Sequence, residues 1–226
     1  RNSLVMKQDW KPGTMIYPLP AVLVSCGSTP EEYNIVTIAW TGTICTNPPM
    51  CYISVRPERY SYEILKRNME FVINLTTKDM ARATDWCGVR SGKDYNKFEE
   101  MHLTPGKSTV VKAPLIEESP LCIECRVKEI MSLGSHDMFI ADVVNVRADE
   151  RNLNLETGKL EMDAVCIKGA ADFSWDGYAG TCDKLDSFYV VSNMKVHITA
   201  KEDCIFYIAG AVDEGYGKPF FRKCDL

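Results

Sequence analysis

The sequence predicts a mainly β protein whose strands close into a barrel or pack as a sandwich. Helix-like segments are few and short, and no internal repeat or low-complexity linker interrupts the chain. Many short strands beside few helices are typical of such architectures. The expected strands are runs of β-branched and aromatic residues separated by glycine, proline and asparagine clusters: Ala21–Cys26, Asn34–Trp40, Cys51–Arg56, Phe71–Leu75, Leu121–Ile130 and Met138–Val146.

Three short helical segments are expected between these strands. The first is Ser61–Arg67, and the second is Lys78–Cys87, which Gly88 would end. A third helical turn is expected near Asp94–Glu100. Glu156–Lys159 has the composition of a hairpin turn.

Charge and hydropathy exclude several classes of partner. The 226 residues carry a formal net charge of −5, which gives no electrostatic reason to expect a nucleic acid or an anionic membrane as partner. No stretch approaches the roughly 20 consecutive apolar residues that a membrane helix needs. The segment Arg1–Trp10 is too polar for a secretory signal. The sequence therefore predicts a soluble protein.

Ten cysteines are scattered along the chain, and several lie inside apolar runs. A free cysteine in such a run behaves as a small hydrophobic residue, so a reducing cytoplasm is the expected location. Cys122 and Cys125 form a Cys-x-x-Cys, but they lie three residues apart on an expected strand and so point to opposite faces. We therefore do not expect them to share a metal ion or a disulfide.

Several signatures of cofactor and metal sites are missing from the sequence. No Gly-x-Gly-x-x-Gly follows an expected strand, and there is no phosphate-binding P-loop and no His-Glu-x-x-His helix. The three histidines, His102, His136 and His197, are too few for a histidine-rich metal centre. A Rossmann dinucleotide site and a histidine-based metal site are therefore not expected.

Two of the expected strands place polar side chains on one face. Alternation along Cys51–Arg56 puts Ser54 and Arg56 together, and Asn74 takes a similar position on the strand that follows. One reading is a solvated outer face. The other is a groove for a ligand with hydroxyls and a phosphate, since arginine offers forked donors to phosphate.

Two glycine-containing segments are further candidates. In Thr37–Ile44 the residues become small and hydroxylated, and Gly42 would let the backbone approach a flat ligand. The alternative is an ordinary barrel strand with a glycine bulge. In Cys87–Lys93 two glycines bracket Arg90 and Ser91, and exposed amides with two cations would suit an anion. A solvated loop is an equally good reading of that segment.

Taken together, the motifs closely resemble those of the flavin reductase and flavoredoxin family. They occur in the family's order between about residue 10 and residue 168, and they are Trp10–Thr14, Tyr17–Pro20, Thr37–Thr43, Asn47–Pro49, Ile53–Arg56, Tyr60–Tyr62, Phe71–Asn74, Cys87–Asp94, Lys97–Phe98 and Gly134–His136. The resemblance implies an antiparallel split β-barrel with a few short flanking helices. It also implies bound FMN, a homodimer with the flavin at or near the subunit interface, and NADH or NADPH as the source of hydride.

The resemblance also assigns roles to residues. The segment Thr37, Ile38, Ala39, Trp40, Thr41, Gly42 and Thr43 would line the isoalloxazine ring. The ribityl chain and phosphate would be held by Ser54, Arg56, Ser61 and Tyr62. Asn74 would lie beside the ring, and Ser91 with Lys93 would close over the phosphate. His136 matches a family histidine close to the flavin and nicotinamide and is the one catalytic candidate; a structural histidine at a strand start is the alternative.

The implied function is that of an NAD(P)H-dependent flavin reductase, in which the flavin carries the redox chemistry. The alternative is a flavoredoxin-like electron carrier with little nicotinamide activity, and a third is an FMN-binding sensor or storage protein. The electron acceptor would be a small molecule or a protein. The resemblance assigns residues 1–168 to the flavin-binding domain and gives no role to the extension 169–226, whose stretches Ser187–Val191 and Cys204–Ile208 could be extra strands.

Overall fold

The computed structural model describes residues 7–156 and, beyond them, the backbone of seven strands. The strands of the first part are β1 (Val22–Cys26), β2 (Asn34–Ile38), β3 (Thr41–Cys45), β4 (Met50–Val55), β5 (Glu70–Asn74), β6 (Pro105–Gly106), β7 (Leu115–Ile116), β8 (Leu121–Ser132), β9 (Asp137–Ala148) and β10 (Leu153–Asn154). Its helices are η1 (Pro30–Glu32), α1 (Tyr60–Asn68), η2 (Lys78–Met80), α2 (Ala81–Val89), α3 (Lys97–Glu100) and η3 (Glu150–Asn152), where η marks a 3₁₀ helix.

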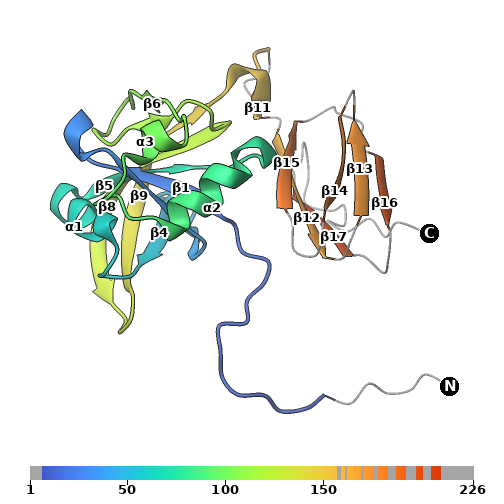
Figure 1. Cartoon of the computed structure of the whole chain (residues 1–226), viewed down its shortest axis with the longest axis horizontal. Helices are drawn as coiled ribbons and strands as arrows, with labels where there is room; N and C mark the ends of the chain where they lie inside the picture. The colour runs from blue at the N-terminus through green and yellow to red at the C-terminus, as the bar shows by residue number, and fades with distance from the viewer. Residues whose placement is uncertain are drawn as a thin grey trace.

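Seven antiparallel strands form one sheet in the order β2-β1-β5-β8-β9-β4-β3. The sheet curls into a half-barrel (Figure 1). Strand β2 approaches β4 across the barrel, and the backbone N–H of Ser54 donates to the carbonyl of Trp40 at 2.9 Å. The mainly β, split-barrel prediction is confirmed.

The alternating strands enclose one apolar core. In β4, Cys51, Ile53 and Val55 are buried and their neighbours are not, as the alternation predicted. Phe71 and Phe139 are fully buried in the same core, and the apolar side of α1 covers it through Leu65. Burying such side chains supplies most of the stabilisation of a β-barrel of this size.

Helices α2 and α3 cover the outer face of β1 and β2. Their apolar side chains pack on Leu23 and Ile35. The buried ammonium of Lys97 donates to the carbonyl of Ile35 at 2.8 Å and to that of Cys87 at 2.7 Å, which fixes α2 and α3 against β2. Burial lowers the pKa of Lys97. These two hydrogen bonds fix where the chain after α2 lies relative to the barrel.

The loop 108–114 covers the outer face of β5 and β8 and is held by a buried carboxylate. Glu124 accepts hydrogen bonds from the backbone N–H groups of Thr109 (2.8 Å), Val110 (2.6 Å) and Val111 (3.2 Å), and from Asn145 Nδ2 (2.8 Å). Burial pushes the pKa of Glu124 up, but these four hydrogen bonds together outweigh it and lower the pKa.

Two differences between the expected and observed boundaries concern the chain around the end of β2. The strand expected over Asn34–Trp40 ends at Ile38, and a bend precedes β3. The second expected helix starts as η2 and continues as α2 through Gly88 to Val89. A Cβ on Gly88 would lie 3.3 Å from the Cβ of Thr37. Gly88 therefore serves the close approach of α2 to β2 and does not end the helix.

The strands beyond residue 156 lie outside the seven-stranded sheet: β11 pairs with β10, and the others form the sheets β15-β12-β17 and β14-β13-β16. They are β11 (Lys159–Leu160), β12 (Met162–Lys168), β13 (Ala171–Trp175), β14 (Tyr178–Cys182), β15 (Ser187–Val191), β16 (His197–Ala200) and β17 (Ile205–Ala209). The two stretches expected as extra strands correspond to β15 and β17. Strand β12 pairs with both of them, so backbone pairing joins residues 162–168 to the extension. The expected turn at Glu156–Lys159 lies partly outside the described residues.

No helix in the described part of the chain is long and apolar enough to cross a membrane.

Candidate functional site

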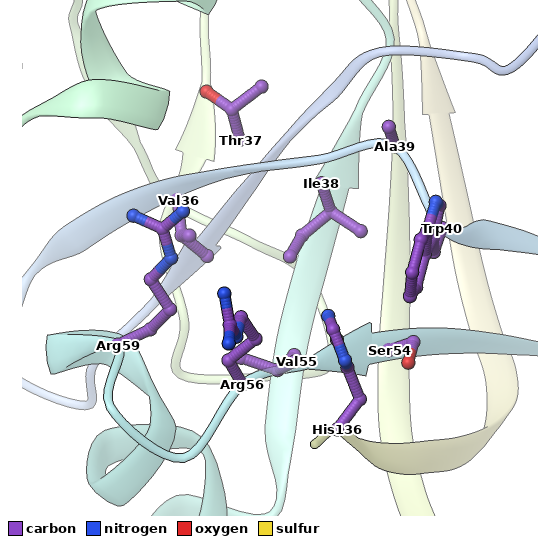
Figure 2. Close-up of a pocket in the computed structure, with 10 residues that line it drawn as sticks. All are labelled: Val36, Thr37, Ile38, Ala39, Trp40, Ser54, Val55, Arg56, Arg59 and His136. Carbon is purple, nitrogen blue, oxygen red and sulfur yellow. The ribbon is translucent and has the colours of Figure 1, made fainter. Parts of the chain in front are cut away.

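A pocket of about 180 Å³ opens between the end of β2, the end of β4 and the β8–β9 turn (Figure 2). It is lined by Val36, Thr37, Ile38, Ala39, Trp40, Ser54, Val55, Arg56, Arg59 and His136. The structure brings six of the fourteen cofactor-binding candidates and the one catalytic candidate to this pocket: Thr37, Ile38, Ala39, Trp40, Ser54 and Arg56, together with His136.

An aromatic pair forms one wall of the pocket. The rings of Trp40 and His136 lie with their centroids 4.6 Å apart and their planes inclined by 34°. Nδ1 of His136 is 2.9 Å from the hydroxyl oxygen of Ser135. Burial, and then the nearby Arg56 guanidinium, lower the pKa of His136. Both effects favour the neutral form of the imidazole. The two rings together offer a flat ligand an aromatic surface.

Two arginines make the opposite end of the pocket cationic. Arg56 follows β4 and lies 3.7 Å from the carboxylate of Glu58. Arg59 precedes α1, and its Nη1 donates to the carbonyl of Gly88 at 3.1 Å. The positive N-terminal end of α1 adds to this potential. An anionic group is the ligand that this end favours.

Sequence reasoning missed Arg59. The signal available was its spacing, three residues after Arg56 and directly before the helix at Tyr60. A turn between a strand end and a helix start brings two such side chains to one place, and Figure 2 shows Arg56 and Arg59 next to each other at the pocket.

The bend between β2 and β3 is fixed by several hydrogen bonds. The hydroxyl of Thr37 donates to the carbonyl of Thr84 on α2 at 2.5 Å, so this side chain faces the helix and points away from His136 (Figure 2). The hydroxyl of Thr41 donates to the carbonyl of Tyr52 at 2.6 Å. Thr37 thus lines the pocket without offering its hydroxyl to it.

The β3 candidates Thr41, Gly42 and Thr43 lie next to the pocket but do not line it. Gly42 pairs with Tyr52 of β4, and a Cβ on it would lie 3.2 Å from Cε1 of the tyrosine ring. The flat group for which this glycine makes room is therefore the ring of Tyr52.

Asn74 is not brought to the pocket. It is fully buried on the outer face of β5, donates to the carbonyl of Leu23 and the hydroxyl of Ser25 at 2.9 Å each, and accepts from the N–H of Ile116 at 2.9 Å. The expectation that Ser54, Arg56 and Asn74 share one face was wrong, because β5 lies between β1 and β8, apart from β4, and both of its faces are covered.

Ser61 and Tyr62 are also buried away from the pocket, within α1. The hydroxyl of Ser61 accepts from Asn34 Nδ2 at 2.7 Å. The hydroxyl of Tyr62 donates to the carboxylate of Asp137 at 2.5 Å, and this bond raises the pKa of Tyr62 to about 12. Both side chains tie α1 to the barrel, and α1 in turn positions Arg59.

Ser91 and Lys93 lie on the exposed loop after α2. The hydroxyl oxygen of Ser91 accepts from the N–H of Lys93 at 3.2 Å. A Cβ on Gly92 would lie 2.1 Å from Asn34 Oδ1, so this loop rests directly on Asn34. Lys93 lines a different, polar pocket together with Tyr60 and Tyr95. The loop thus lies near the start of α1 at Tyr60 but does not line the pocket that contains Arg56.

Metal-binding clusters do not form within the described residues, where no three His, Cys, Asp or Glu side chains come together. Cys122 and Cys125 lie in different apolar clusters, on opposite sides of β8, in agreement with the alternation. Cys125 contacts Cys51 in the barrel core, with 3.5 Å between the two sulfurs.

A family model described as the flavin reductase like domain matches residues 14–160. The chain belongs to the flavin reductase-like family. The matched range contains the whole seven-stranded sheet and the pocket. An uncharacterised protein from Archaeoglobus fulgidus is 30% identical over 131 residues, which cover 58% of this chain and 73% of the relative.

Solved structures with the same fold include flavoproteins. Flavoredoxin of Desulfovibrio vulgaris (Miyazaki F) is 30% identical, with a TM-score of 0.63, 69% of this chain and 83% of the flavoredoxin being covered. An FMN-binding protein from Thermus thermophilus has a TM-score of 0.57 at 21% identity and covers 81% of this chain and 98% of its own, which shows the shared fold.

Proposed function

We propose that this chain binds FMN in the pocket between β2, β4 and the β8–β9 turn, and that it oxidises NADH or NADPH as a flavin reductase. One observation carries the proposal: in a family split barrel, two arginines and an aromatic wall face the same pocket. The arginines would hold the phosphate, and the Trp40 end would lie beside the isoalloxazine ring.

The residues present fit such a ligand. Arg56 and Arg59 supply forked donors suited to a phosphate. Ser54 lines the pocket near Trp40 (Figure 2), and its hydroxyl would bind the ribityl chain. Val36, Ile38 and Val55 give the pocket an apolar floor. We propose that backbone groups at the bend before Thr41 bind the pyrimidine edge of the ring. FMN, once bound, supplies the hydride-accepting and electron-donating chemistry.

The protein's own residues would orient the reactants and set the local charge. His136, which packs against Trp40 and whose neutral form is favoured, would border the nicotinamide without adding a positive charge beside it. We further propose a flavoredoxin-like electron carrier as the second candidate function, because the flavoredoxin of D. vulgaris is among the solved structures most like this chain.

We also propose a homodimer and a cytoplasmic location. Strand β3 is an edge of the seven-stranded sheet, and its Ile44 is 47% exposed, so a second copy could cover it. The six cysteines whose side chains are described are all free thiols, which fits a reducing compartment. Sedimentation of the purified protein at several concentrations tests the dimer.

Phosphate binding at the arginines is expected to raise the pKa of His136. In the free protein that pKa is lowered by burial and then by Arg56, and a dianion beside the arginines would offset their charge. Because the pKa of His136 is lowered in the free protein, the folded protein without FMN is also expected to lose stability as pH falls from the ordinary histidine value of 6.5 through the lowered pKa. Titration of the His136 ring by NMR, with and without FMN, measures the shift; an unchanged or lower pKa with FMN would place the phosphate elsewhere.

The activity itself is tested by anaerobic titration. The purified protein is mixed with FMN, freed of excess flavin, and treated with NADH or NADPH while the visible spectrum is recorded. Bleaching of the bound flavin by either nicotinamide supports the reductase. A yellow protein that neither nicotinamide bleaches supports the electron carrier, and a protein that retains no flavin contradicts the proposal.

A further inference from the structure

A second pocket, of about 370 Å³, shares a wall with the first. It lies between the N-terminal segment 13–19 and the β8–β9 hairpin, and Trp40 and Ser54 line both pockets. Its volume falls in the range typical of small-molecule sites. A ligand in it would therefore lie next to the ring end of the proposed flavin site.

The chemistry of the second pocket differs from that of the first. All residues that line it lie within the described residues 7–156, and none of them carries a charge. Met15, Ile16, Leu19, Leu133 and Met138 are its aliphatic side chains, and the hydroxyls of Thr14, Tyr52 and Ser54 and the indole N–H of Trp40 are its polar side-chain groups. An ionised ligand here would lose hydration without a partner, which costs several kcal/mol or more.

Two features favour a ring-shaped ligand. The indole of Trp40 and the phenol of Tyr52 offer flat surfaces, and aromatic rings stack on such surfaces with an offset. The methionines adapt their shape to the rim of a ligand. Ile16 and Leu133 are 80% and 57% exposed, so a bound molecule would cover apolar surface that now faces water.

We propose that this second pocket binds the electron acceptor, and that the acceptor is a small, uncharged ring compound of the quinone class. This rests on the proposed function and names its substrate class. Reduction of such a quinone takes up two electrons and two protons and gives the hydroquinone. The hydride from NADH or NADPH supplies both electrons and one proton, the solvent supplies the other proton, and the nicotinamide leaves oxidised.

Binding of duroquinone, an uncharged quinone with no position open to thiol addition, tests the proposal. Calorimetric titration of the protein, with and without FMN, measures its affinity. A trimethylbenzoquinone carboxylate is the charged probe. We expect Leu133→Asp to weaken duroquinone binding by about tenfold or more, and Ile16→Asp to act in the same direction. Met131→Asp is the matched control, because Met131 is an exposed apolar residue of the same hairpin that does not line the pocket.

The proposal stands if duroquinone binds, the carboxylate binds more weakly, and Leu133→Asp weakens duroquinone while FMN affinity stays within twofold of the wild type. Equal binding of both probes, or equal effects of Leu133→Asp and Met131→Asp, would overturn it. Loss of FMN together with the quinone would also overturn it, because the pocket would then hold the flavin ring. A lack of duroquinone binding would overturn it as well, including in a protein in which a second copy of the chain covers segment 13–19. Failure of FMN to bind while duroquinone binds as expected would contradict the proposed function alone.

Discussion

Replacing Arg56 with alanine is expected to weaken FMN binding by about 1–3 kcal/mol, or roughly fivefold to 150-fold in Kd. Arg59→Ala is expected to have an effect of the same size, since its guanidinium faces the same end of the pocket. A charge-assisted hydrogen bond to phosphate is lost in each case. Quenching of flavin fluorescence on titration with protein gives both constants.

The arginine effect is separated from general electrostatics by a matched control. Arg82 is exposed on α2 and does not line the pocket, so Arg82→Ala is expected to leave FMN affinity nearly unchanged. Riboflavin, which lacks the phosphate, is expected to bind the wild type and the Arg56→Ala variant equally. Unchanged FMN affinity in both pocket variants would remove the phosphate from this end of the pocket.

Glu124→Ala is expected to lower the free energy of unfolding by about 3 kcal/mol. The variant leaves three backbone N–H groups of the loop 108–114 and the amide of Asn145 without their acceptor. Urea unfolding followed by tryptophan fluorescence measures the loss, and Glu129→Ala is the control, because Glu129 is exposed on the same strand. Equal stability of the two variants would show that the buried carboxylate does not hold the loop.

The same carboxylate predicts a pH dependence. The folded-state pKa of Glu124 is lowered, so its contribution is fully present above the ordinary value of 4.5 and is lost as pH falls from there through the folded-state pKa. The stability difference between wild type and Glu124→Gln should therefore shrink below pH 4.5. A difference that stays constant from pH 7 to pH 3 would contradict the assigned role.

The strands and the main pocket residues were predictable because both follow from local patterns. Alternation along β4 identified the buried face of Ile53 and the open face of Ser54 and Arg56. The ordered motifs identified Trp40 and His136 as neighbours of one site, and both line the pocket. Each of these residues lies at or near the end of a strand, where the chain leaves the core and its neighbours in sequence are also its neighbours in space.

The polar residues that proved to be buried were not predictable in this way. Asn74 alternates correctly for a groove, but the loop after α3 returns over β5 and covers that face. Ser61 lies at a helix start, where its hydroxyl could bind a phosphate, but its oxygen accepts a hydrogen bond from Asn34 of β2. Both outcomes depend on contacts between segments more than 25 residues apart, which periodicity within one segment does not contain.

The roles of Arg59 and Gly88 also depend on contacts between segments that are distant in the sequence. Arg59 was passed over because no strand face includes it, and Gly88 was read as a helix stop because glycine commonly has that role. In the structure the carbonyl of Gly88 accepts from Arg59, and the missing side chain of Gly88 lets α2 approach Thr37. Both roles arise because α2 packs against the end of β2 and the turn before α1.

A crystal structure of the protein with FMN tests the central claim most directly. The account predicts phosphate oxygens within hydrogen-bond distance of Arg56 or Arg59 and an isoalloxazine ring beside Trp40, next to a second pocket that stays open. FMN bound elsewhere on the chain, or a phosphate distant from both arginines, would contradict it.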